Sequence, residues 1–383
     1  MMGFPKEEYL KRLYNIHKKL ENENIDAIVI TSPANFRYFS GLDSNFWESP
    51  TRPWFLIISK NGKIKALVPS IGLSAIESTF IKDIEVWQSP NPKDEGTSLL
   101  KKIIKTFPKN SNIGFELGME TYLRMSIKEF LKIKKDLKEY NFIDSTNIVW
   151  SLRKIKSNIE ISNIEKICSI TSKVFDNFIN KISLGMSERE IATLFKKELI
   201  NNGVDYIMYL SCASGINGYN QIICNPSKKK LGDGDILIID TGSTINGYFC
   251  DFDRNFGFGN INQKSLNAYN KLWDATEKTL EIIKPGISCK EIYESLSKNL
   301  FSNNIKSKVG RMGHGFGLQL TEPPSIMIDD NTILEKNMIL ALEPSIEIEN
   351  GLILVHEENV LITENGNRLL TTRTPKELPV INV

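Results

Sequence analysis

The residues best suited to chemistry lie in the stretch from Ile236 to Arg254, ILIIDTGSTINGYFCDFDR. An apolar run ends at Asp240, the dipeptide Asn246-Gly247 follows, and a second β-forming run carries Asp251. Asn-Gly between two such runs is the strongest short-range signal for a β-hairpin. The pattern therefore predicts a hairpin that brings the carboxylates of Asp240 and Asp251 side by side.

A third acid in the same stretch raises the question of what balances the charge. Asp253 shares a strand face with Asp251, because side chains alternate along a strand with a period of two. Arg254 is a single cation beside three acids, and an unpaired buried carboxylate is costly. A divalent metal is therefore the favoured partner. Asp253 has three open roles: neighbour of the ligands, orienter of a metal-bound water, or partner of Arg254.

Three downstream motifs each supply one further donor beside β-forming or glycine-rich sequence. They are Gly313-His314-Gly315-Phe316-Gly317, Ala341-Leu342-Glu343-Pro344 and Val355-His356-Glu357-Glu358-Asn359-Val360. The full ordered set of predicted ligands is Asp240, Asp251, His314, Glu343 and Glu357. Its four carboxylates balance two divalent cations, and sites of this composition activate a water for hydrolysis. The set predicts a dinuclear metal hydrolase.

Each donor also has a structural alternative when it is taken alone. Asp240 or Asp251 is suited to a turn or a helix cap, His314 to a structural role among glycines, and Glu343 to a strand end that pairs with lysine. His356 neighbours Glu357 on a predicted strand and should point to the opposite face. We expect His356 to support the site from behind or to be structural, and we also count it among the candidate substrate contacts.

The order of these motifs resembles that of the pita-bread metallopeptidases. The resemblance rests on the GHGxG motif, on Thr321-Glu322-Pro323-Pro324, on the LEP motif of Glu343 and on the run that begins at Glu357. The segment from Thr31 to Tyr38, TSPANFRY, is also similar to the creatinase/prolidase amino-terminal domain. This family includes methionine aminopeptidase, prolidase, aminopeptidase P, the metal-free creatinase and the ectoine hydrolases.

The resemblance implies both a fold and a mechanism. The fold is α/β (α+β): a creatinase-like amino-terminal α/β domain, then a pita-bread domain of duplicated helix-helix-hairpin units about a pseudo-twofold axis. The implied cofactors are two divalent metal ions (Mn, Co, Zn or Fe), and Glu343 is implied to shuttle the proton. A homodimer that cleaves a C-N bond of an Xaa-Pro dipeptide or of another small molecule is also implied.

The chain departs from the proline peptidases at two positions. Those enzymes carry a histidine before the first aspartate ligand and another in an HExP segment. Here the first place is taken by Ile222-Ile223-Cys224-Asn225-Pro226, and the second by Thr321, a candidate catalytic position. The chain has three histidines in all, so none is left for these roles. The alternatives are a small-metabolite hydrolase of the ectoine hydrolase or creatinase type, more remotely a dimethylsulfoniopropionate-type lyase, or an inactive binding module.

Length and composition argue for a two-domain protein without a nucleic-acid or membrane partner. The 383 residues exceed one ordinary core, and 48 lysines and arginines against 46 acids create no net field. No apolar run is long enough to span a membrane. Residues 1 to 20 do not have the pattern of a signal peptide. Five cysteines without CxxC spacing indicate reduced thiols, and hence a cytoplasmic location.

We expect an amino-terminal domain over residues 1–152 and a catalytic domain over residues 158–383. The first should begin with an amphipathic helix that buries Leu10, Leu13, Ile16 and Leu20. The further expected elements are strands at 26–31, 54–59, 63–68, 84–87, 113–116 and 148–150, and helices near 97–106 and 121–137. This alternation predicts a sheet covered by helices.

One loop of the amino-terminal domain has an unusual composition. The segment from Phe46 to Trp54, FWESPTRPW, contains two tryptophans, an arginine and two prolines. Aromatic loops often bind ligands, so Trp47, Arg52 and Trp54 are candidate substrate contacts. The structural alternative is a proline-stiffened loop that packs on its own domain.

The carboxyl-terminal half contains an internal repeat. Gly185-Met186-Ser187-Glu188-Arg189-Glu190-Ile191 matches Gly286-Ile287-Ser288-Cys289-Lys290-Glu291-Ile292. Both copies contain Ser-x-x-Glu, the capping box of a helix start. When Asp240 is shifted along the chain by the spacing between the two copies, it falls close to Glu343. The repeat predicts two helix-helix-hairpin units that each donate carboxylates to one shared site.

Overall fold

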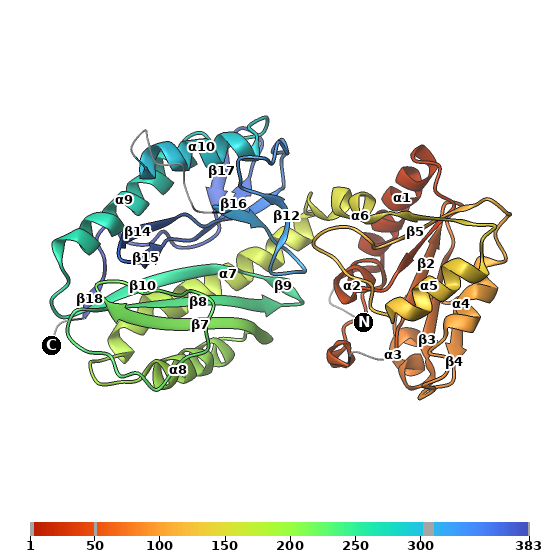
Figure 1. Ribbon diagram of the computed structural model, residues 1–383, viewed down its shortest axis with the longest axis horizontal. Helices are drawn as coiled ribbons and strands as arrows, with labels where there is room; N and C mark the ends of the chain where they lie inside the picture. The colour runs from red at the N-terminus through yellow and green to blue at the C-terminus, as the bar shows by residue number, and fades with distance from the viewer. Residues whose placement is uncertain (1–3, 50–51, 302–309, 382–383) are drawn as a thin grey trace. The chain divides into compact units, whose positions relative to one another are not determined.

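The computed structural model describes residues 4–49, 52–301 and 310–381 and divides into two compact units (Figure 1). Unit 1 spans Met1–Arg153 and unit 2 spans Lys154–Val383. Each unit contains its own sheets and its own hydrophobic core.

Unit 1 is built around one mixed sheet. Its elements are α1 (Lys6–Asn22), β1 (Ala27–Ile30), α2 (Pro33–Ser40), η1 (Asn45–Glu48), β2 (Phe55–Ser59), β3 (Ile64–Pro69), η2 (Ser70–Gly72), α3 (Leu73–Glu77), β4 (Ile84–Trp87), α4 (Thr97–Ile104), β5 (Asn112–Phe115), α5 (Ile127–Asp136), β6 (Asn141–Asp144) and α6 (Thr146–Arg153). The strand order is β4-β3-β2-β1-β5-β6. The pairs β1–β5, β5–β6 and β3–β4 are parallel, whereas β1–β2 and β2–β3 are antiparallel.

Helices α4 and α5 cover this sheet through one apolar cluster, as the alternation of elements predicts. Ile103 of α4 and Ile133 of α5 are buried in it beside Phe115 of β5. The TSPANFRY segment caps the end of β1, because the buried carboxylate of Glu116 accepts hydrogen bonds from the main-chain N–H groups of Thr31 and Ser32. Helix α2 begins at that point.

Three details of the sequence-based assignment are wrong. Leu10 is 46% exposed, and Tyr9 takes its place on the buried face of α1. Residues 148–150 belong to helix α6 and not to a strand, because burial follows a helical spacing from Thr146 through Val149 to Arg153. Helix α5 begins at Ile127 and not near residue 121.

Unit 2 contains two larger sheets and two helix pairs. Its elements are α7 (Asn158–Phe178), η3 (Ile179–Lys181), α8 (Glu188–Asn201), β7 (Tyr206–Ile216), β8 (Asp235–Ile245), β9 (Tyr248–Phe249), β10 (Phe252–Phe258), α9 (Gln263–Leu280), α10 (Cys289–Leu300), β11 (Gly313–Gly315), β12 (Glu322–Ser325), β13 (Ile339–Leu342), β14 (Ser345–Glu349), β15 (Leu352–Val355), β16 (Glu358–Ile362), β17 (Asn367–Leu369) and β18 (Val380–Ile381).

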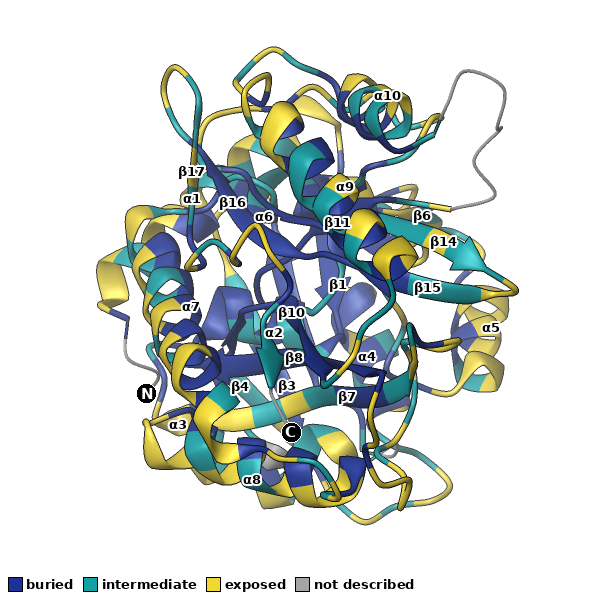
Figure 2. Ribbon diagram, turned by 90° about the vertical axis from the view of Figure 1, so that its left-hand side faces the viewer, coloured by how far each residue is buried: buried dark blue, intermediate teal, exposed yellow. Residues whose placement is uncertain are grey.

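The first sheet has the order β18-β10-β8-β7, with β9 paired to β8, and the second has the order β12-β11-β13-β16-β17. In Figure 1, α7 and α8 accompany the first sheet, while α9 and α10 lie with the later strands. Figure 2 shows β8 and β10 as buried strands, whereas β7 carries exposed residues along the sheet edge.

The predicted duplication is confirmed by matching hydrogen bonds in the two halves. Ser187 and Glu190 form a capping box at the start of α8, and Ser288 and Glu291 form the same box at the start of α10. The preceding glycines also match, because the Gly185 N–H donates to Leu231 and the Gly286 N–H donates to Leu334. The turn before the second helix of each pair is therefore tied in the same way to the segment that precedes β8 or β13.

All five cysteines are free thiols. Within residues 4–49, 52–301 and 310–381, none of the helices has the length and apolar character needed to cross a membrane.

Candidate metal centre

The β8–β10 hairpin positions the first group of acids as the sequence predicts. Its turn has Asn246 at φ 49° and Gly247 at φ 75°, a left-handed pair that these two residue types favour. Asp240 on β8 lies opposite Asp253 on β10 in the antiparallel register. Asp251 lies immediately before β10, where the chain leaves β9. Three carboxylates therefore gather at one part of the hairpin.

The second sheet supplies the imidazole and the remaining acids. His314 lies on β11, which pairs with β13, and the N–H of Glu343 donates to Met312 at 2.9 Å just beyond that ladder. Glu357 lies directly before β16. The glycines around His314 are required by space, since a Cβ on Gly313 would lie 2.2 Å from the main-chain oxygen of Ala341. The motif therefore allows close strand approach at the histidine.

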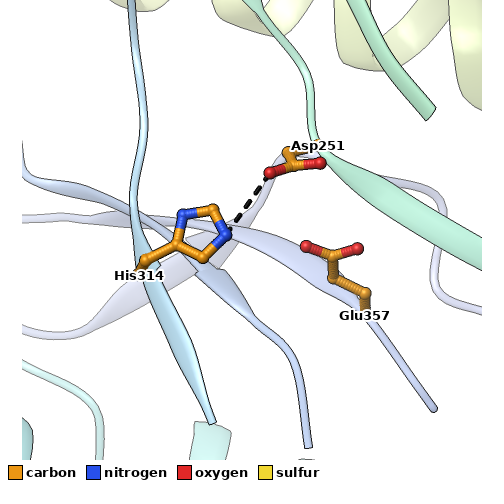
Figure 3. A group of neighbouring side chains, drawn as sticks. All are labelled: Asp251, His314 and Glu357. Carbon is orange, nitrogen blue, oxygen red and sulfur yellow. Dashed lines mark ion pairs between the residues drawn. The ribbon is translucent and has the colours of Figure 1, made fainter. Parts of the chain in front are cut away.

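Asp251, His314 and Glu357 converge on one point (Figure 3). One ligand atom from each lies within 4.8 Å of the others. All three side chains are buried, with exposed fractions of 5%, 3% and 2%. They come from different segments, one from the first hairpin and two from the second sheet, so the cluster forms only when the two halves are packed together.

The hydrogen bonding of His314 shows that the cluster fits a cation. Its Nδ1 lies 2.9 Å from the carbonyl oxygen of Gly315, which can only accept, so Nδ1 carries the proton. The lone pair of Nε2 then faces Asp251 Oδ2 at 3.4 Å. Two acceptors that face each other repel unless a cation lies between them. Burial, reinforced by the charge of Arg311, lowers the pKa of His314 to about 4, so the ring itself is not that cation.

The carboxylates raise one another's pKa, which places them in one electrostatic cluster. Burial, reinforced by the charge of Glu343, raises the pKa of Asp240 to about 7. Burial, with the charges of Asp240 and Glu343, raises the pKa of Asp251 well above its usual value. The pKa of Glu357 is raised well above its usual value by burial and then by Asp251, Glu343 and Asp240. Positive charge among the four acids, from protons or from a metal cation, would therefore relieve their mutual repulsion.

One oxygen of Asp240 gives the same indication. Asp240 is half-buried, and its Oδ1 is enclosed yet has no hydrogen-bond partner among the described residues. An enclosed, unpaired carboxylate oxygen is costly. A set of carboxylates and one neutral imidazole matches the ligand preference of divalent metals. The five predicted ligands therefore fit such a group by their chemistry.

The side chains of Asp253 and Arg254 bond to different groups. Asp253 is 1% exposed and accepts from Asn255 Nδ2 at 3.3 Å, and burial followed by the charge of Asp240 raises its pKa well above the usual value. The guanidinium of Arg254 forms its ion pair with Glu358 at 3.1 Å and donates to the carbonyl oxygen of Glu357 at 2.9 Å. Arg254 thus holds the main chain behind one ligand, and Asp253 lies opposite Asp240 in the β8–β10 register.

His356 is buried beside Tyr269. It is 1% exposed, and its ring lies 5.5 Å from that of Tyr269. Neither ring nitrogen has a hydrogen-bond partner within the described part of the chain. Burial lowers its pKa well below the usual value, and the charges of Arg373 and Arg254 add to this. His356 and Glu357 lie between β15 and β16 and not on a strand, so the strand alternation expected for this pair does not apply.

The described residues of the aromatic loop, 46–49 and 52–54, pack within unit 1. Trp54 is 1% exposed and contacts Phe36 and Trp47 through ring pairs at 5.9 and 5.3 Å. Arg124 lies over the Trp47 ring at 5.2 Å. Arg52 has φ 59° and its N–H donates to Glu95 at 3.0 Å. The structural alternative, a loop packed on its own domain, describes this arrangement.

Three residues near the cluster escaped the sequence analysis. Tyr209 on β7 donates to Ile222 at 3.2 Å, and burial followed by the charge of Asp240 raises its pKa. Arg311 donates from Nη2 to Thr321 Oγ1 at 3.4 Å. Asn359 lies on β16, two residues after Glu357, and bonds to the main chain of Asp251. Proximity to the GHG motif and to Glu357 was the available signal for Arg311 and Asn359.

Comparisons with known proteins agree with this architecture along the whole chain. The model of the creatinase/prolidase N-terminal domain matches residues 12–155, and that of metallopeptidase family M24 matches residues 162–364. The second match covers more than half of the chain. The expected fold, a creatinase-type domain followed by a pita-bread domain, is thereby confirmed.

Individual relatives align from end to end. The Xaa-Pro dipeptidase of Pyrococcus furiosus is 29% identical over 375 residues, covering 96% of this chain and 99% of the relative. The crystal structure of a recombinant prolidase from Thermococcus sibiricus has a TM-score of 0.86 at 25% identity, covering 97% and 99% of the two chains. That of an X-Pro aminopeptidase from Thermotoga maritima has a TM-score of 0.81 at 25% identity, with the same coverage. With this fold, this buried cluster and the match to the metallopeptidase model, the chain belongs to metallopeptidase family M24 and is a hydrolase.

Proposed function

We propose that this protein is a metal-dependent dipeptidase that cleaves Xaa-Pro dipeptides. The observation that carries the proposal is the neutral His314, whose Nε2 lone pair faces Asp251 within a cluster of buried acids. The end-to-end similarity to the Xaa-Pro dipeptidase of Pyrococcus furiosus supports the choice of substrate.

The proposed ligand set is Asp240, Asp251, His314, Glu343 and Glu357, holding two divalent ions of manganese, cobalt, zinc or iron. When bound, ions of this kind lower the pKa of a water and polarise the scissile carbonyl. The chain itself contributes fixed donors. The His314 tautomer is set by Gly315, and the carbonyl of Glu357 is held by Arg254. Such supporting bonds orient the ligands and strengthen the site.

Glu343 is the proposed proton carrier. It is half-buried, whereas Asp251 and Glu357 are buried, so Glu343 is the more accessible to substrate. In the proposed step the water oxygen bonds to the carbonyl carbon while Glu343 takes a proton from that water. Glu343 then passes the proton to the leaving nitrogen as the C-N bond breaks. Asp253, beside Asp240, maintains the negative charge behind that ligand.

A second candidate is hydrolysis of a non-peptide C-N bond in a small metabolite. It is favoured by the residues at the two histidine positions of the proline peptidases. Ile223 is 81% exposed at the first, and Thr321 accepts a hydrogen bond from Arg311 at the second. Neither residue can donate as a histidinium does.

The test is turnover of Ala-Pro by protein reloaded with manganese or cobalt, beside ectoine and creatine. Release of alanine and proline by the wild type, and none by Asp251→Asn, is the expected result. Turnover of ectoine or creatine without release of proline would replace the dipeptidase proposal by the second candidate. The exposed Asp233→Asn variant serves as a charge-matched control, since this acid bonds only to Asn260 in the described structure.

A further inference from the structure

Arg311 is a cation placed beside the acidic cluster. It precedes β11 by two residues and His314 by three, and its side chain is half-buried. The main chain next to Arg311 is joined to another proposed ligand, because the N–H of Glu343 donates to the carbonyl oxygen of Met312 at 2.9 Å. Arg311 is therefore close in the chain both to His314 and to the residue that bonds Glu343.

The guanidinium of Arg311 makes a hydrogen bond that uses only part of its donor capacity. A guanidinium has five N–H donors. Within the described residues Arg311 makes one hydrogen bond, a long one of 3.4 Å to Thr321 Oγ1. Arg254 is a useful contrast, because it donates to Asp253, Glu357, Glu358 and Thr372. Arg254 is a structural cation, whereas Arg311 retains donors for another acceptor.

The anchor of Arg311 lies close to the first ligand strand. Leu320, the residue before Thr321, packs against Gly242 so closely that a Cβ on that glycine would lie 2.3 Å from Leu320 Cδ1. Gly242 follows Asp240 by two residues on β8. The N–H of Phe249 also donates to Gly317 at 2.8 Å, which holds the same loop against the hairpin. Thr321, and the guanidinium bonded to it, therefore belong to a loop that packs against β8 two residues from Asp240.

A dipeptide brings its own negative charge to this place. Its terminal carboxylate lies one residue from the scissile bond, so it must approach the half-buried Glu343. Like charges at this range repel, and a guanidinium that can bond a carboxylate in two places offsets that repulsion. We infer that Arg311 is the residue that binds the terminal carboxylate of the substrate and so restricts this site to small anionic substrates. The inference rests on the proposed function for the identity of the substrate.

The test separates anion binding from turnover. L-proline and L-prolinamide differ in the carboxylate alone, and calorimetric titration of the metal-loaded protein measures each without any reaction. Arg311→Gln should lower the affinity for L-proline roughly 10- to 100-fold and leave that for L-prolinamide unchanged. Arg311→Lys should lower the affinity for L-proline by a smaller factor, because lysine keeps the positive charge. Thr321→Val should give an intermediate loss, since it removes only the anchor.

Kinetics supply a second measurement. With Ala-Pro, Arg311→Gln should raise KM by a similar factor and change kcat little, whereas with Ala-Pro amide KM should not change. The control is Arg368→Gln, an exposed arginine that pairs with Glu165. Equal loss of affinity for L-proline and L-prolinamide in Arg311→Gln would overturn the inference, as would no loss for either. If Arg311→Gln loses affinity for L-proline alone, and the wild type cleaves no dipeptide, the inference about Arg311 holds and the proposed function fails.

Discussion

Asn359 holds the main chain of Asp251 on both sides. Its Oδ1 accepts the N–H of Asp251 at 3.1 Å, and its Nδ2 donates to the carbonyl oxygen of Asp251. The Asn359 side chain is fully buried, and its Oδ1 also accepts from the thiol of Cys168 at 3.3 Å. One amide from β16 therefore fixes the position of a proposed ligand on the opposite hairpin.

Replacing Asn359 should weaken metal binding more than it weakens the fold. Asn359→Leu removes both hydrogen bonds to Asp251, and we expect metal affinity to fall by roughly 10- to 100-fold. Stability of the metal-free protein should fall by about 1–3 kcal/mol. Metal titration by calorimetry and urea unfolding measure the two effects. Asn177→Leu is the control, because that exposed amide donates only within α7. Unchanged affinity in Asn359→Leu would contradict the role.

Asp251→Asn should change the stability of the metal-free and metal-loaded proteins in opposite directions. Without metal, the substitution removes a carboxyl group that burial beside Asp240 and Glu343 disfavours as an anion, so the free energy of unfolding should rise by roughly 1–3 kcal/mol. With metal, the variant should lose the stabilisation that binding gives the wild type. Unfolding curves with a chelator and with added manganese provide the comparison. Lower stability in the chelator would show that Asp251 is held by something other than a cation.

The two capping boxes should contribute equally to stability. The Ser187 N–H and the Ser288 N–H each donate to a glutamate at 2.8 Å, and each serine is 8% exposed. Ser187→Ala and Ser288→Ala should therefore each cost about 1 kcal/mol. Urea unfolding of the two variants and of their double mutant checks this. A difference well above that size would mean that the repeated units are not equivalent in energy.

Glu116→Gln should destabilise unit 1 without affecting the metal centre. Glu116 is 1% exposed and accepts from Thr31, Ser32 and Asn35 through both oxygens. An amide turns one of those oxygens into a donor that faces other donors, at a cost of about 3 kcal/mol. Limited proteolysis and thermal unfolding measure the loss. Metal content should equal that of the exposed control Glu77→Gln, and a parallel fall in metal content would disprove the independence of the two effects.

The part of the site that sequence predicts is the part set by local chemistry. Asn246-Gly247 specifies the hairpin turn, and the glycines of the GHG motif specify close strand approach at His314. The bonds of Asn359 to Asp251 join residues 108 apart in the chain, so no periodicity or turn signal in the sequence predicts them. The same limit explains residues 148–150, a short apolar run that suits a strand or a buried helix equally well.

The division of the ligands between the two repeated units has a consequence for how this protein is made. Asp240 and Asp251 are synthesised well before Glu343 and Glu357, and neither unit alone presents the full set. Bringing these two pairs of ligands together closes a long loop of the chain, and this costs conformational entropy before any ion is bound. High-affinity metal uptake should therefore come late in folding, as the event that locks two already formed units together.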